Sequence, residues 1–211
     1  MQFKLAALTF GLTLALCACA GKAERNTAQR ALDLRQKLLS GTCSFQAELT
    51  ADYGEYVSEF SVSCVHSAED GTTMTIHAPQ TLAGLRAQVD KTGVKLVFED
   101  TEAAFGTLTN LKLSPMAAPQ LLAQAWESGY ISLIGTEDGA LHVTYLLGYD
   151  EDELTIDTWL KDGAPEYAQI ACGGQTVLQA VLTDFTIQEA KTDHENTQKN
   201  MGGYLVGQSG T

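Results

Sequence analysis

The sequence has 211 residues, of which 45% are hydrophobic, and its net charge at neutral pH is −13. This length and apolar content suffice for one domain with a buried core. The negative charge argues against nucleic acids as partners and against electrostatic docking on anionic lipid.

The first residues have the features of an export signal. Lys4 precedes a nearly continuous apolar run, Leu5–Cys19, which is shorter than the roughly 20 residues needed to span a bilayer. The run ends in the letters LCAC and resembles the lipobox of bacterial lipoproteins. Cys19 is the better acceptor of the lipid, because choosing Cys17 would place the bulky Leu16 where a small residue is required.

This interpretation predicts the domain organisation: a signal peptide (1–18), a lipidated tether (19–23), one domain (24–187) and a C-terminal tail (188–211). Loss of Lys4 with the signal leaves 12 basic and 26 acidic side chains, a net charge of −14. Acyl chains such as palmitate on Cys19 would hold the protein on the extracytoplasmic face of a bacterial membrane. The alternative is a plain secretory signal in which both cysteines are incidental.

An amphipathic helix is predicted over 24–40, before the strands begin. Its apolar stripe would be formed by Ala28, Ala31, Leu32, Leu38 and Leu39, and Gly41 would end it.

A β-hairpin is predicted over 43–64, with its turn at Tyr53-Gly54. This turn would pair Phe45 with Val62, Ala47 with Phe60 and Cys43 with Cys64, all on one apolar face. A cross-strand disulfide between Cys43 and Cys64 follows, worth about 3 kcal/mol. Cys172 would be the odd thiol.

The remaining chain alternates in the same way. Strands are expected over 85–90 and 94–98, and two further hairpins over 140–160 and 166–187. A helix is expected over 114–128, with Ser114 as cap and Gly129 as its end. The predicted fold is therefore α+β: one curved antiparallel sheet with helices against a single face.

This order of features resembles the LolA/LolB-like lipoprotein-sorting carriers and the LppX-like lipid-binding lipoproteins. The segments that carry the resemblance are CSFQAELT, IHAPQTLAGLRAQV, KTGVKLVFEDTE, LSPMAAPQLLAQAWESG and WLKDGAPEYAQIACGGQTVLQAVLTDFTI. The resemblance implies an incomplete barrel, or half-shell, whose concave face is covered by helices, with acyl chains in the apolar gap. That clan has no catalytic signature to transfer.

No catalytic or metal-binding pattern is found, so no enzyme activity and no cofactor are predicted. The histidines at 66, 77, 142 and 194 lack metal-ligand spacing, and the first three are better explained as strand residues. The acidic letters YDEDE fit a solvated hairpin tip better than a calcium loop.

The apolar stripe remains as the candidate ligand site. It comprises Phe45, Phe60, Val62, Leu85, Leu96, Phe98 and Trp126. Each could be ordinary core, but a single sheet with few helices leaves a large apolar face that either closes tightly or holds a ligand. We expect a monomer that binds lipid or an acylated protein. The alternative is a regulatory or sensor module of the cell envelope, with the same fold, a protein partner and no ligand cavity.

Overall fold

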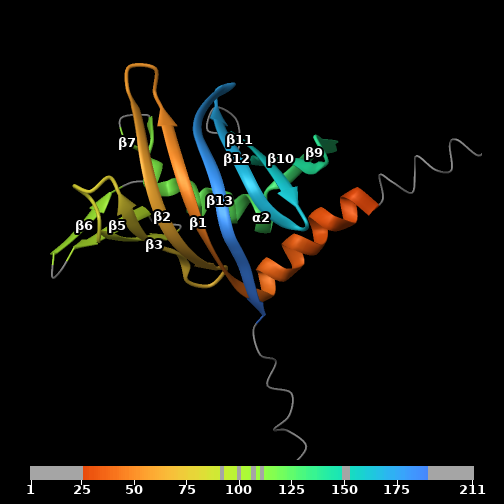
Figure 1. The fold of residues 1–211 in the computed structure, drawn as a ribbon, viewed down its shortest axis with the longest axis horizontal. Coiled ribbons are helices and arrows are strands. Elements are labelled where there is room, and N and C mark those ends of the chain that lie inside the picture. Colours follow the sequence, from red (N-terminus) through yellow and green to blue (C-terminus); the bar gives the residue numbers. More distant parts are fainter. Residues whose placement is uncertain are drawn as a thin grey trace, which may run out of the picture.

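The computed structural model describes residues 26–90, 93–98, 101–105, 108–109, 112–148 and 153–189. Cys19, the predicted signal peptide and nearly all of the predicted tail lie outside these residues. The described residues form one antiparallel sheet of eleven strands in the order β6-β5-β4-β3-β2-β1-β13-β12-β11-β10-β9 (Figure 1). The sheet does not close into a barrel, because β6 and β9 are its two edges.

Most strands follow one another as hairpin neighbours, and the longest, β13, returns to pair with β1 in the middle of the sheet. The strands of the large sheet are β1 (Gly41–Asp52), β2 (Val57–Ser67), β3 (Gly71–Ala78), β4 (Arg86–Asp90), β5 (Gly93–Phe98), β6 (Thr101–Phe105), β9 (Tyr130–Glu137), β10 (Ala140–Leu147), β11 (Leu154–Lys161), β12 (Ala164–Cys172) and β13 (Gln175–Glu189). Two short strands, β7 (Leu108–Thr109) and β8 (Lys112–Leu113), pair separately.

One face of the sheet, called here the inner face, is buried beneath the helices. In β1, for example, Phe45, Ala47 and Leu49 are buried, whereas the intervening Gln46 and Glu48 are exposed. This two-residue period is that of a sheet with one packed face and one solvated face. The predicted fold class, a curved antiparallel sheet with helices on one face, is confirmed.

The first helix, predicted over 24–40, is described over residues 26–40, and it buries only part of the predicted stripe. Ala31, Leu34 and Leu38 are buried, whereas Leu32 and Leu39 are largely exposed. The buried positions are spaced three and four residues apart, so they form one narrow row along the helix. Leu32 and Leu39 each lie one position beyond this row, so they are not packed in the core. No helix among the described residues is long and apolar enough to cross a bilayer.

The first hairpin has the predicted faces but a different register. The two strands are joined by the four residues 53–56, where the Gly54 N–H donates to Asp52 Oδ1 (2.8 Å) and Gly54 has a φ of 83°. This longer loop shifts the pairing by two residues, so Cys64 faces Phe45 and Cys43 faces His66. A shift of two keeps every side chain on its predicted face, which is why the faces were right and the pairs were wrong.

The predicted Cys43–Cys64 disulfide is contradicted: both cysteines are buried free thiols, and Cys172 is also free. In the observed register the two residues are diagonal neighbours. The Cα atoms of such neighbours lie roughly 7–8 Å apart. This exceeds the Cα separation of about 4.4–6.8 Å that a disulfide usually spans. Burial raises the pKa of the Cys43 thiol to about 12, and the charge of Glu127 adds to the effect. Burial also raises the pKa of Cys64.

The predicted helix over 114–128 is present in two parts. A 3₁₀ turn, η1 (Pro115–Ala117), leads into α2 (Ala118–Ser128). Ser114 precedes η1 but makes no side-chain cap, contrary to the prediction. Gly129 ends the helix as predicted, because a Cβ there would lie 2.7 Å from the Ala125 carbonyl oxygen. Figure 1 shows α2 crossing one face of the sheet.

A β-bulge in β13 changes which side chains reach the inner face. The pairing with β1 shifts between Ser44 and Gln46, opposite Asp184, which has a φ of 53°. The Gln46 amide donates to Asp184 Oδ2 at 2.9 Å. The extra residue moves Phe185 to the inner side, where its ring stacks on Phe45.

The free and buried state of the thiols predicts their reactivity. Near neutral pH, iodoacetamide should modify the half-buried Cys172 first, and should reach Cys43 and Cys64 only after unfolding in urea. A thiol with a pKa of about 12 has almost no reactive thiolate near neutral pH. Intact mass and peptide mapping would measure this order. A cross-linked Cys43–Cys64 peptide without reductant would contradict the observed register.

Candidate ligand-binding site

The centre of the inner face is packed. The Trp126 ring on α2 packs edge-on against both Phe45 of β1 and Phe185 of β13, with ring centroids 5.9 Å and 5.8 Å away. Its indole N–H donates to Thr158 Oγ1 at 3.0 Å, and both side chains are fully buried. Edge-to-face contacts of this kind leave no room for a ligand between α2 and the middle of the sheet.

The ligand-facing residues predicted from the sequence therefore lie in or against this core. Phe45, Val62 and Trp126 are buried in it, and Phe60, Leu85 and Leu96 are half-buried and pack on it. Phe98 ends β5, and its side chain lies outside the described residues. None of the six described residues lines the pockets described below, so a ligand-facing role for them stays a prediction.

The carboxyl end of α2 is held by the first helix. Arg35 donates from Nε to the Trp126 carbonyl oxygen (3.2 Å) and from Nη2 to that of Gly129 (2.5 Å). These carbonyls lie where a helix leaves its last acceptors unpaired, and a cation there also meets the negative end of the helix dipole. Arg35 thus joins the two helices, and it also lines an open groove beside them.

This groove has a volume of about 1130 Å³ beside the end of α2 and is called here the β9–β11 groove. Most of its surface is apolar, and its residues come from the first helix, α2, β9, β10 and the start of β11. They are Arg35, Leu121, Gln124, Ser128, Gly129, Tyr130, Ile131, Leu146, Leu147, Gly148, Glu153 and Leu154. Pockets that hold small ligands are commonly about 300–1,000 Å³ with mostly apolar walls, so this groove has room for a long apolar chain.

Tyr145 lies on the inner face of β10, two residues before Leu147. Its side chain is buried, and its hydroxyl has no hydrogen-bond partner among the described residues. Burial raises the pKa of Tyr145 to about 12, while the positive charge of Arg35 acts in the opposite direction. A buried unpaired hydroxyl costs about 1–3 kcal/mol.

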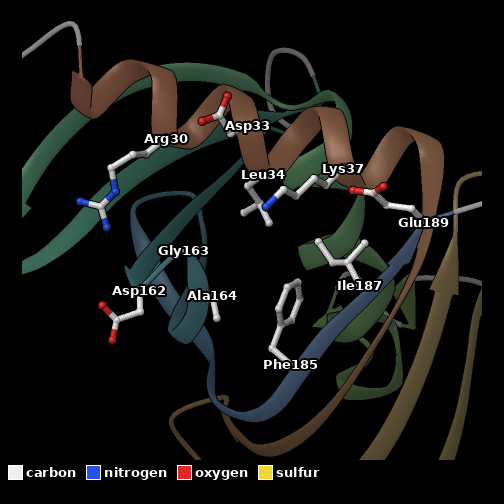
Figure 2. Close-up of a pocket in the computed structure, with 10 residues that line it drawn as sticks. All are labelled: Arg30, Asp33, Leu34, Lys37, Asp162, Gly163, Ala164, Phe185, Ile187 and Glu189. Atoms are coloured by element: carbon white, nitrogen blue, oxygen red, sulfur yellow. The ribbon is translucent and has the colours of Figure 1, made fainter.

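A smaller cavity, of about 370 Å³, lies under the first helix at the other end of β11. Figure 2 shows Leu34 and Lys37 on the helix above Phe185 and Ile187 on β13. Its remaining lining residues are Arg30, Asp33, Asp162, Gly163, Ala164 and Glu189. The floor of this cavity is apolar, but side chains of both charge signs surround it. The cavity therefore indicates a ligand class less clearly than the β9–β11 groove does.

A third pocket, of about 500 Å³, lies on the other side of α2 and includes a buried polar network. The Thr72 hydroxyl donates to Gln120 Oε1 (2.7 Å) and contacts His66 Nδ1 (2.8 Å), while His66 Nε2 contacts Glu127 Oε1 (2.9 Å). Because Thr72 has given its only proton to Gln120, His66 Nδ1 must be protonated.

The contact between His66 Nε2 and Glu127 then requires one further proton, carried by either the imidazole or the carboxyl group. The side chains of His66 and Glu127 are 2% and 10% exposed. A pair this buried is costly to break, commonly by 3–5 kcal/mol, so it fixes α2 against β2. As the sequence predicted, His66, His77 and His142 are strand residues. No cluster of metal-ligand type is found among the described residues.

Several groove residues were missed by the sequence reasoning. Leu121 lies four residues before Ala125 on the predicted helix, and Leu147 continues the alternation of β10, so each carried a local signal. Nothing local indicated that Arg35 would reach across to α2, or that Ile131 would lie at an edge of the sheet. The groove brings together segments that are distant in sequence.

Comparison with models of known protein families and with curated protein sequences finds no match. Solved structures do match. A putative outer membrane lipoprotein-sorting protein domain from Vibrio parahaemolyticus is 10% identical, with a TM-score of 0.43 over 82% of this chain and 95% of that one. A LolA superfamily protein from Nitrosomonas europaea is 8% identical, with a TM-score of 0.41 over 79% and 94%.

The lipoprotein LppX of Mycobacterium tuberculosis is 13% identical, with a TM-score of 0.36 over 76% of this chain and 93% of that one. The similar structures thus include proteins of both groups that the sequence resembles, matched over most of each chain.

The unpaired hydroxyl predicts the effect of Tyr145→Phe. Removing the hydroxyl should increase the free energy of unfolding by about 1 kcal/mol, because the ring stays buried and the unsatisfied group is lost. Urea unfolding of the two proteins would measure the difference, with Tyr130→Phe as a control at an exposed site. A loss of stability in Tyr145→Phe would mean that the hydroxyl is paired in solution.

Proposed function

We propose that the protein is an extracytoplasmic binding protein that holds the acyl chain of a lipid, or of a lipidated protein, in the β9–β11 groove. The observation that supports this function is the groove itself: about 1130 Å³, lined by Leu121, Ile131, Leu146, Leu147 and Leu154. Burial of apolar surface contributes about 25 cal/mol per Å², without directional contacts. Such a groove would accept acyl chains with little selectivity, and binding involves no covalent step.

The polar residues of the groove suit a ligand with one polar end. Gln124, Ser128 and Gly129 lie at the end of α2, next to Arg35. The unpaired hydroxyl of Tyr145 lies within electrostatic reach of the same guanidinium. A carboxyl or ester group at this end of the groove would find donors, while its chain lies along the leucines of β10 and β11.

Membrane anchoring through Cys19 would keep the groove close to the source of its ligand. Six residues, 20–25, lie between Cys19 and residue 26, the first described residue of the first helix, so the chain makes seven residue-to-residue steps between them. Such a tether spans at most about 25 Å when fully extended. The start of the first helix would then stay within this distance of the membrane, and the groove, which Arg35 of the same helix lines, could exchange acyl chains without release of the protein into bulk solvent.

The packed centre of the inner face supports a second candidate function, the regulatory or sensor module with a protein partner. The trio of Phe45, Trp126 and Phe185 fills the space that a centrally bound lipid would occupy. In this case the groove would receive side chains of a partner protein rather than an acyl chain. Binding of delipidated partner and failure to bind acyl probes would distinguish this function from the first.

Filling the groove should abolish acyl binding. We expect purified protein to bind a fluorescent palmitate analogue, and Leu147→Trp and Ile131→Trp to weaken this binding at least about tenfold by occupying the apolar volume. Fluorescence titration would measure the affinity, and mass spectrometry would identify co-purified lipid. Val65→Trp is the matched control, because Val65 is on the outer face of β2 and 50% exposed.

Two results would contradict acyl binding in the groove. One is the absence of both co-purified lipid and probe binding. The other is equal probe binding by the groove variants and the Val65→Trp control.

The anchor is tested separately, in cells that express the full chain. Cys19→Ser should abolish incorporation of radiolabelled palmitate and move the protein from the membrane fraction to the soluble fraction. Cys17→Ser should leave both unchanged, because this residue is expected to be removed with the signal. Palmitate labelling that persists in Cys19→Ser would contradict the anchor.

A further inference from the structure

The strand β9 is an open edge of the sheet. It pairs with β10 on one side and is last in the strand order, so the backbone groups on its other side face no strand among the described residues. Natural proteins usually protect such edges with lysine, proline or inward-pointing charge. The sequence of β9, YISLIGTE, contains none of these, and its only charged residue is Glu137 at the end.

Large apolar side chains are exposed along this edge. Tyr130 is 71% exposed and Leu133 is 51% exposed. The pairing of β9 with β10 contains one β-bulge, at Ser132, and the apolar edge around it is a template for another strand.

The edge is continuous with the β9–β11 groove. Tyr130 and Ile131 belong to β9 and also line the groove. In a strand added along β9, every second side chain would point to the inner side. Those nearest Ile131 would enter the groove, so one extended segment could use the backbone edge and the apolar walls together.

The charges at the two ends of β9 differ. Glu137 and Asp138 lie at one end. Glu153 lies near the other end. It precedes Leu154 of β11, which pairs with Leu147 of β10, and the neighbouring Leu146 pairs with Tyr130. Neither β9 nor β10 contains a lysine or arginine. At the Tyr130 end, Arg35 of the first helix contributes one positive charge, because its guanidinium donates to the carbonyl oxygen of Gly129 directly before β9.

This distribution selects a positively charged occupant. A cationic segment would be attracted to the end of the edge that carries Glu137 and Asp138, and to the acidic chain as a whole, whereas a second copy of this chain would bring another net charge of −13.

We propose that β9 binds an extended, positively charged polypeptide segment as an additional strand, with apolar side chains of that segment entering the groove. The backbone supplies most of the affinity, the alternating apolar side chains supply the register, and the terminal carboxylates supply the charge preference. This interaction uses the groove of the proposed function but does not require an acyl ligand.

The test uses the full chain and a fluorescein-labelled peptide of alternating lysine and valine, about as long as β9. Fluorescence anisotropy should show that this peptide binds at least about tenfold more tightly than a peptide of the same composition with lysines and valines in two blocks. An alternating glutamate–valine peptide should bind no better than the block peptide. Hydrogen–deuterium exchange should show new protection in β9, the edge that the peptide covers.

Leu133→Lys is the decisive variant, because it places a charge on the edge strand without touching the lining of the groove. It should weaken binding of the alternating peptide at least about tenfold. Val65→Lys is the matched control: it makes the same type of change at a residue of similar exposure, on the outer face of the central strand β2. Thermal unfolding would verify that both variants fold.

The outcomes separate this interaction from acyl binding. Leu133→Lys should bind the fluorescent palmitate analogue as tightly as the wild type does, whereas Leu147→Trp should bind it at least about tenfold more weakly. Equal binding of the alternating and block peptides, equal binding by Leu133→Lys and Val65→Lys, or no protection in β9 would each overturn the edge interaction. If the wild-type chain does not bind the palmitate analogue, this result overturns only the proposed acyl function.

Discussion

The position of Trp126 determines where this protein has space for a ligand. Its ring contacts Phe45 and Phe185 on two central strands, its indole nitrogen donates to Thr158, and its carbonyl oxygen accepts from Arg35. One residue of α2 is therefore tied to β1, β13, β11 and the first helix. Burial of a tryptophan side chain of this size commonly contributes several kcal/mol, so α2 is fixed where it crosses the sheet.

Because α2 fills the centre of the inner face, the larger pockets lie along its flanks. Gln124 and Ser128 line both the β9–β11 groove and the polar pocket that contains His66. The two sides differ in chemistry. One side has leucines from β10 and β11, and the other has a buried histidine and carboxyl pair. A helix that is held by the buried His66–Glu127 contact on one side leaves the apolar side as the one suited to a lipid chain.

The sequence predicted the sheet, its apolar face and both helices, because alternation and helical spacing are local patterns. It failed on the pairing of the first hairpin, which depends on a four-residue loop, and on the disulfide that this pairing implied. It also did not place Phe185 against Trp126, because that contact depends on the bulge at Asp184. The sequence pattern around Phe45 and Trp126 is the same whether these residues line a cavity or fill a core. Only the position of α2 decides between a cavity and a core.

The acidity of the chain and its open edge are physically related. An apolar edge strand without lysine or proline would ordinarily invite pairing between copies of the same protein. A net charge of −13 opposes that pairing, since each copy repels the next. The same charge attracts cationic chains, so the property that keeps β9 free of its own copies also defines the partner that could cover it. The groove and the edge share Tyr130 and Ile131, and a ligand in one therefore alters the surface offered by the other.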